Sequence, residues 1–183
     1  MVQINVSQQL KAPIGSVRNY EVDETVDMTD GSILVQGQVG LMRTDRGILT
    51  RGALQTKIEF TCSRCLSLFR LPLALTIEEE YFPTTDVLTG ISIPVPDEPG
   101  SFTIDEHNIL DLTEAIRQYA LLASPMKPLC RADCAGLCPT CGGNLNQVQC
   151  DCPPLPADPR WSKLSELTLA YEQVSADEGQ GTK

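Results

Sequence analysis

The sequence has no long apolar run and no export signal. Across its 183 residues the longest apolar candidate is the short stretch 119–123, far below the length needed to span a bilayer. The first residues, MVQINVSQQLKAP, lack both the basic leader and the apolar segment of a secretion signal. We therefore expect a soluble, cytoplasmic protein that has no membrane partner.

Basic and aromatic residues are also scarce. The chain has 14 Lys and Arg against 24 Asp and Glu, a formal charge of −10, and its aromatic content is 5%. Non-specific binding of nucleic acid depends on phosphate neutralisation, and single-stranded readout depends on aromatic stacking. This composition therefore argues against a protein that coats nucleic acid. One stretch differs, because residues 43–70 carry six basic and two acidic side chains.

Histidine, the most common residue in general acid–base catalysis, is nearly missing. The single histidine, His107, lies beside Asp105 and Glu106, where a solvated loop residue is the ordinary interpretation. No Ser-His-Asp or Cys-His arrangement can be assembled, and the glycines lack the spacing of a phosphate-binding loop. We predict no catalytic residue and a protein that is not an enzyme.

Cysteine, by contrast, is abundant and clustered. In a reducing cytosol thiols at short regular spacings are more often metal ligands than disulfides. Four thiolates close the coordination sphere of zinc, which makes a site structural rather than catalytic. We predict two structural zinc ions, held by eight ligands in CxxC, CxxxC and CxC patterns: Cys62, Cys65, Cys130, Cys134, Cys138, Cys141, Cys150 and Cys152.

The division of these ligands between two ions is open from sequence alone. The short loops within 138–152 favour one local site, because closing a short loop costs less chain entropy. Cys62 and Cys65 would then share the other ion with Cys130 and Cys134, although an exchanged pairing is possible. Free cysteines and a thiol redox pair are weaker interpretations, since a redox CxxC begins a helix whereas this one joins two strands.

Period-two alternation predicts strands at 2–10 and 33–42, followed by turn residues at 44–47. The alternation is clean over 54–60 and resumes over 69–77. These two runs flank the first CxxC, so we place it at the tip of a β-hairpin.

The remaining segments predict a surface loop at 84–107 and then a helix. Its apolar residues recur at helical spacing from Ile109 to Ala123, Asp111 is its expected N-cap, and Pro125 ends it. A short helix should begin at Asp158, and the chain after Val174 should be a disordered tail. We expect an α+β fold: an antiparallel sheet or partly open barrel, a packed helix and a cysteine-rich zinc-binding segment. The expected domains are a core at 1–129, a zinc-binding ribbon with its closing helix at 130–172 and a tail at 173–183.

Five segments carry a resemblance to a known family. FTCSRCL at 60–66, DLTEAI at 111–116, PMKPLC at 125–130, GLCPTCG at 136–142 and DPRW at 158–161 resemble the bacterial YceD family of large ribosomal RNA subunit accumulation proteins. The resemblance implies a role in ribosome biogenesis, through accumulation or maturation of large-subunit ribosomal RNA (rRNA), and it implies no catalytic activity.

Charge then suggests the kind of partner. Each four-thiolate zinc site carries a net charge of −2, which takes the formal charge to about −14. We expect a ribosomal protein or large-subunit assembly intermediate to bind the acidic surface, with possible rRNA contact at Arg64, Arg70 and Lys57. The alternatives are a zinc-ribbon protein that acts directly on rRNA and a thiol redox protein.

Overall fold

The computed structural model describes residues 1–28, 31–95, 100–153, 158 and 160. The chain divides into two compact units, Met1–Cys134 and Ala135–Lys183. The division expected from the sequence stays a prediction. Its tail lies outside the described residues, as does the helix expected from Asp158 except for residues 158 and 160.

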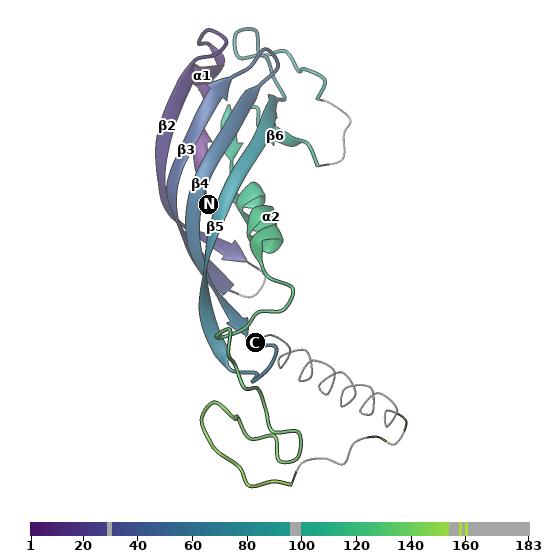
Figure 1. Cartoon of the computed structure of the whole chain (residues 1–183). Helices are drawn as coiled ribbons and strands as arrows, with labels where there is room; N and C mark the ends of the chain where they lie inside the picture. The colour runs from purple at the N-terminus through teal and green to yellow at the C-terminus, as the bar shows by residue number, and fades with distance from the viewer. Residues whose placement is uncertain (29–30, 96–99, 154–157, 159, 161–183) are drawn as a thin grey trace, which may run out of the picture. The chain divides into compact units, whose positions relative to one another are not determined.

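The first unit is built on a seven-stranded sheet that curls around a helix (Figure 1). This arrangement confirms the expected α+β class and the partly open barrel. The strands follow the order β1-β7-β6-β5-β4-β3-β2 across the sheet. Their bounds are β1 Gln3–Asn5, β2 Val17–Met28, β3 Gly31–Arg43, β4 Ile48–Thr61, β5 Leu68–Pro83, β6 Phe102–Ile104 and β7 Ile109–Asp111.

Long antiparallel pairings between β2, β3, β4 and β5 make most of this sheet. Burial alternates along β4, where every second side chain up to Thr56 is buried and the intervening ones face solvent or lie half-buried. The strand expected at 33–42 is therefore confirmed within β3, and the hairpin with CxxC at its tip is confirmed as β4 and β5.

One end of the sheet separates into two ribbons. The pairing of β3 with β4 ends at Val35 and Thr56, whereas β4 and β5 stay paired as far as Thr61 and Leu68. Residues 57–61 and 68–72 therefore form a two-stranded extension, here called the hairpin extension. A two-stranded ribbon has little packing of its own, so its tip needs another source of stability.

The helix α2 (Thr113–Ala123) fills the curl of the sheet (Figure 1). Ala115, Ile116 and Ala120 are fully buried on its inner face, and α2 contacts both β5 and β2. Since β4 and β3 lie between those two strands, the sheet must bend around the helix to reach it on both sides. Neither α2 nor the four-residue α1 (Ser7–Leu10), the helices of the described part, could cross a membrane.

Two sequence expectations are confirmed only in part, at the amino end and in the loop at 84–107. The expected strand at 2–10 stops at Asn5 and gives way to α1, where Gln9 is buried and donates to the carbonyls of Ser16 and Leu41. The expected loop contains β6, which pairs in parallel with the end of β5.

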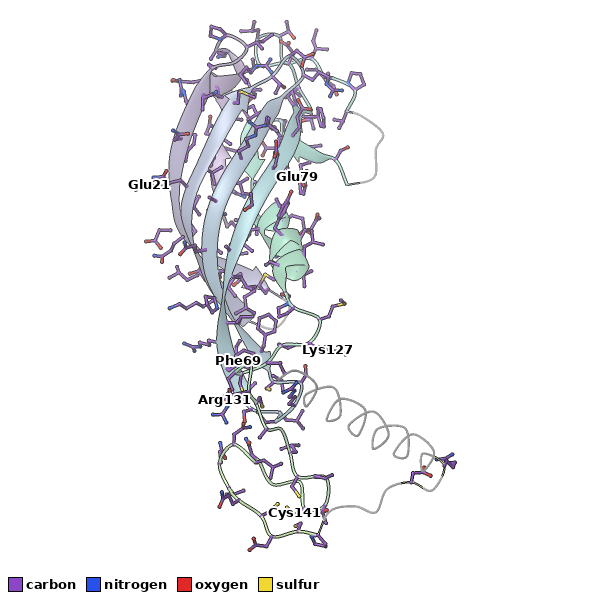
Figure 2. All side chains as sticks on the ribbon, viewed as in Figure 1. Glu21, Phe69, Glu79, Lys127, Arg131 and Cys141 are labelled. Carbon is purple, nitrogen blue, oxygen red and sulfur yellow. The ribbon has the colours of Figure 1, made fainter. Side chains whose placement is uncertain are left out.

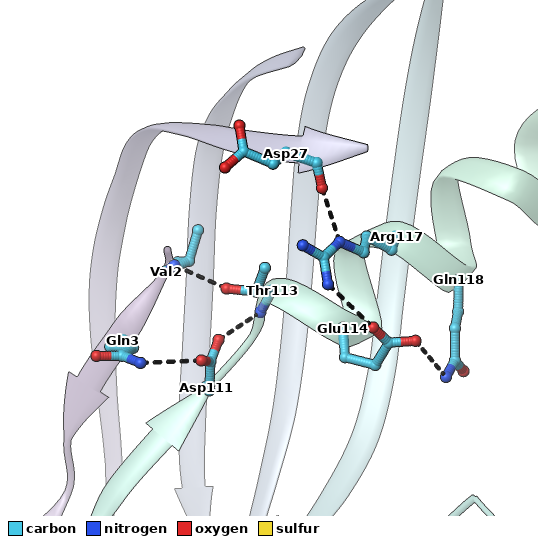
Figure 3. Close-up of polar contacts among 8 residues, drawn as sticks. All are labelled: Val2, Gln3, Asp27, Asp111, Thr113, Glu114, Arg117 and Gln118. Atoms are coloured by element: carbon cyan, nitrogen blue, oxygen red, sulfur yellow. Dashed lines mark hydrogen bonds and ion pairs between the residues drawn. The ribbon is translucent and has the colours of Figure 1, made fainter. Parts of the chain in front are cut away.

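The long helix also begins later than expected. Ile109–Asp111 form β7, which pairs with β1, so α2 starts at Thr113 and its N-cap is Leu112 rather than Asp111. Asp111 still supports the helix start, since its Oδ1 accepts a hydrogen bond from the Thr113 N–H at 2.8 Å (Figure 3).

Candidate metal centres

The first cysteine pair lies in a tight turn that joins β4 to β5. The Cys62 N–H donates to the Ser67 carbonyl at 2.9 Å, and the Leu66 N–H donates to the Cys62 carbonyl at 3.0 Å. Leu66 adopts a left-handed conformation with φ of 57°, which is uncommon for a residue with a side chain. The turn leaves both Cys62 and Cys65 buried rather than pointing into solvent.

The chain after α2 returns to this turn and supplies two more cysteines. The Ser63 N–H donates to the Pro128 carbonyl at 2.8 Å. The Arg64 Nη1 donates to the Cys134 carbonyl at 3.0 Å. These two hydrogen bonds hold the segment that carries Cys130 and Cys134 against the hairpin tip.

The four sulfurs of this first site have the spacing of a metal centre. They all lie within 4.8 Å of one another, with Cys62 to Cys134 at 3.8 Å and Cys65 to Cys130 at 3.6 Å. A tetrahedral zinc ion with Zn–S bonds of about 2.3 Å places its sulfurs roughly 3.8 Å apart. A disulfide would need about 2.05 Å. The site therefore fits a metal ion held by four thiolates.

Backbone groups favour the thiolate form at Cys62. Hydrogen bonding to the Cys65 backbone is the largest cause that lowers the pKa of Cys62 to about 6. A hydrogen bond from the Ser67 side chain is the largest cause that lowers the pKa of Cys65. Burial raises the pKa of Cys130 to about 12, so without a cation this group would keep a proton. A bound metal ion would displace that proton.

The second site lies wholly within the second unit. The Cys138 N–H donates to the Gly143 carbonyl at 2.8 Å, and the Gly142 N–H donates to the Cys138 carbonyl at 2.9 Å. Gly142 has φ of +72°, and a Cβ on Gly143 would lie 3.4 Å from the Cys141 sulfur. The two glycines thus allow the tight turn and the close approach of the backbone that the CPTCGG sequence predicts.

This turn meets the CxC segment of the same unit. The sulfurs of Cys138, Cys141, Cys150 and Cys152 all lie within 4.8 Å of one another. The Cys141 backbone is the largest cause that lowers the pKa of Cys138 to about 6, and the Thr140 N–H, 3.4 Å from the sulfur, adds to it. A hydrogen bond with the Cys141 thiol is the largest cause that raises the pKa of Cys152 to about 12.

The two groups differ in their surroundings. Cys62, Cys65 and Cys134 are buried at the first site, whereas Cys138 alone is buried at the second and Cys141 is exposed (labelled in Figure 2). All eight cysteines expected to be ligands fall into these two groups, which match the local partition favoured from the sequence. That these groups bind metal, and that the metal is zinc, stays a prediction.

The three basic residues expected to contact RNA lie at or near the hairpin extension. Lys57 and Arg70 are exposed, and Arg70 lies 3.9 Å from Glu59, its cross-strand partner. Arg64 is also exposed, but its hydrogen bond to the Cys134 carbonyl ties it to the first site. His107 is largely exposed, with Nε2 3.8 Å from the Glu106 carboxylate.

Sequence reasoning overlooked two groups that build the first site. Ser67 hydrogen-bonds the Cys65 sulfur from two residues further on, and the Pro128 carbonyl anchors the turn. The position of Ser67 just after the CxxC was the available signal, since the turn after such a pair aims its polar groups at the sulfur. Nothing in the sequence marks a backbone carbonyl for this role.

Comparison with known proteins gives a family match and several bacterial relatives. The family described as Large ribosomal RNA subunit accumulation protein YceD matches residues 50–168. A Mycobacterium tuberculosis protein described as uncharacterized is 34% identical over 148 residues, 75% of this chain. A Mycobacterium leprae protein with the same description is 26% identical over 137 residues, 74% of this chain.

These relatives are longer than the present chain. The alignments span 64% of the Mycobacterium tuberculosis protein and 59% of the Mycobacterium leprae protein. No solved structure shows significant similarity to this chain.

Proposed function

Because this chain belongs to the YceD family of large ribosomal RNA subunit accumulation proteins, we propose that it is a non-enzymatic ribosome biogenesis factor. It supports accumulation or maturation of large-subunit rRNA by binding a ribosomal protein or a large-subunit assembly intermediate in the cytoplasm. The two groups of four cysteines support the non-enzymatic part of this proposal, because their spacing suits closed, structural metal sites.

Zinc at these groups would act as a cross-link. At the first site the residues that would hold it are Cys62 and Cys65 on the hairpin tip and Cys130 and Cys134 after α2. Four thiolates leave no open coordination position for a substrate, so the ion has a structural role. The chain's own part is to present the hairpin extension in a fixed position.

The hairpin extension is the element that we assign to rRNA contact. Lys57 and Arg70 are exposed there, and Lys57 forms no ion pair within the described residues. A few phosphate contacts of this kind supply positioning rather than sequence readout. The overall charge of −10 weakens the attraction of the protein to RNA. We therefore assign tight association with the assembling subunit to an additional protein partner.

The test is depletion of the protein in the organism that encodes it, followed by measurement of the ratio of large-subunit to small-subunit rRNA. We expect this ratio to fall and a tagged copy to sediment with precursors of the large subunit. An unchanged ratio together with no association with these particles would overturn the proposal. Retention of function by a chain whose cysteines are all replaced by serine would overturn the structural role of zinc.

A further inference from the structure

The strand β2 forms one end of the sheet and has an open edge. It is paired with β3 along its whole length and is the last strand in the sheet order. Eight of its twelve residues are exposed, including the consecutive residues Asp23, Glu24 and Thr25. A long exposed edge offers unpaired backbone groups to another strand.

The contact with α2 shows which backbone groups point outward. The Arg117 Nε donates to the Asp27 carbonyl at 2.7 Å, so this carbonyl faces away from β3 (Figure 3). In an antiparallel pair the backbone groups of successive residues point to opposite edges. Asn19, Glu21, Asp23 and Thr25 therefore present their N–H and C=O groups at the open edge. Within the described part of the chain, Arg117 covers this edge at Asp27.

The open edge of β2 also carries acidic side chains. Glu21, Asp23 and Glu24 are exposed, and Figure 2 shows Glu21 at the outer side of β2. None of the three takes part in an ion pair within the described part of the chain, and across the strand pair Glu21 and Asp23 face the neutral Gln38 and Gln36. Asp23 Oδ1 accepts a hydrogen bond from Gln36, which leaves its charge in place.

This charge selects among possible occupants of the edge. RNA is disfavoured because the carboxylates would repel phosphates. A second copy is disfavoured because pairing two such edges would place carboxylates opposite carboxylates, which is destabilising. A strand with Lys or Arg at these positions would gain both backbone hydrogen bonds and favourable cross-strand charge pairs.

We propose that the open edge of β2, over residues 19–25, binds an extended Lys- and Arg-rich segment of a partner protein by strand addition. The inference rests on the proposed function, because ribosome assembly supplies basic protein segments. It goes further by naming the surface and the chemistry of the segment.

The test is titration of the full chain with a synthetic peptide that alternates lysine with valine, and with a matched peptide that carries glutamate in place of lysine. We expect the lysine peptide alone to bind, and the amides of Asn19, Glu21, Asp23 and Thr25 to become protected from hydrogen exchange. Equal binding of both peptides, or no added protection in β2, would overturn the proposal.

Two variants separate the charge contribution from the backbone contribution. The triple variant E21Q/D23N/E24Q should bind the lysine peptide roughly tenfold more weakly. The control D45N/E59Q/E106Q makes the same charge change at exposed carboxylates elsewhere and should lose far less affinity. Thr25→Pro removes one outward N–H without touching the β3 pairing, and should weaken binding while melting stays unchanged. Full binding by Thr25→Pro would overturn strand addition, and equal losses in the triple variant and its control would overturn the location.

The proposal can fail separately from the proposed function. If the triple variant loses peptide binding but still associates with large-subunit precursors, this edge is not the route to the ribosome, although the family role stands. If the triple variant loses both peptide binding and association with large-subunit precursors, the edge proposal and the proposed function are both supported.

Discussion

Arg64 shows how the setting of a single side chain changes its expected role. From sequence it belongs to a basic surface for RNA, since it lies between two cysteines at a turn tip. In the structure its guanidinium donates to the Cys134 carbonyl. Its charge therefore helps to hold the segment that carries two ligands, and this contribution must be measured separately from any contact with RNA.

We expect Arg64→Gln to weaken the first metal site without abolishing it. The lost hydrogen bond should lower the free energy of unfolding by about 1 kcal/mol. Thermal melting of the zinc-loaded protein, together with the rate of zinc loss to a chelator, measures the effect. Arg18→Gln, on the exposed start of β2, is the matched control and should melt as the unmodified protein does. Identical zinc loss in both variants would show that the contact with Cys134 adds nothing.

The two sites should also respond differently to the loss of one ligand. Cys65→Ser removes a buried ligand that joins the hairpin tip to the segment after α2, so we expect the first unit to lose several kcal/mol of stability. A loss of this size should lower its melting temperature by roughly 6 °C or more. Cys150→Ser should instead loosen residues 135–153 and leave the melting of the sheet nearly unchanged.

Each of these serine variants serves as the control for the other, because both remove one thiolate and one zinc ion. Hydrogen exchange by residue should show the loss of protection near the hairpin tip in Cys65→Ser and within the second unit in Cys150→Ser. Equal falls in melting temperature, or the same pattern of lost protection, would contradict this division of roles.

At the scale of elements, the predictable parts are those whose burial follows a simple period. The strand β3, the hairpin of β4 and β5, and the body of α2 all show such patterns. The strand β2 was missed because its open edge leaves consecutive residues such as Asp23 and Glu24 exposed, which breaks the alternation.

The short strands could not be predicted from the spacing of apolar residues. Strands of three residues, such as β6 and β7, contain too few positions to reveal a period of two, and they are specified by the strands that pair with them. At the metal sites the spacing of the cysteines predicts them as ligands, and loop length favours their grouping without deciding it. The supporting groups on Ser67 and Pro128 depend on how the chain folds back after α2.

The hairpin extension carries its own prediction. Replacing Lys57 and Arg70 with Gln should leave zinc content and melting unchanged, because both side chains are exposed. Association with large-subunit precursors should weaken, and its dependence on salt should fall by roughly one unit of slope for each lost phosphate contact. Sedimentation of the variant at several salt concentrations measures both quantities.

The matched control for this pair replaces Lys11 and Arg51, which are exposed basic residues outside the hairpin extension. Its association and salt slope should match those of the unmodified chain. If both double variants behave alike, the basic residues of the hairpin extension only offset the acidic surface, and a protein partner remains as the route to the ribosome.

For the whole molecule we expect two zinc ions per chain in protein prepared under reducing conditions without chelator. Elemental analysis measures the ratio, and cobalt substitution should give the absorption of tetrahedral four-thiolate coordination. Protein that contains no zinc under these conditions, and that takes up none when it is supplied, would rule out the metal role of the cysteines.

Removal of the metal should affect the two units unequally. The first unit has an apolar core around α2, whereas Cys138 is the single buried hydrophobic residue of the second unit within 135–153. A segment of that size without a core depends on its metal to fold. A chelator should therefore unfold residues 135–153 and loosen the hairpin tip, while circular dichroism still reports the sheet. Complete loss of the sheet signal would contradict this expectation.

The number of residues between the ligands predicts that the two sites bind metal at different stages of folding. At the first site the closest sulfur pairs join residues 65 and 72 positions apart, whereas the second site closes within residues 138–152. Closing the longer loop costs roughly 1.4 kcal/mol more. It also requires β4, β5 and α2 to be in place, and contacts between distant residues form slowly. During refolding the second site should therefore capture metal early, and occupancy of the first should mark a chain whose folding is complete.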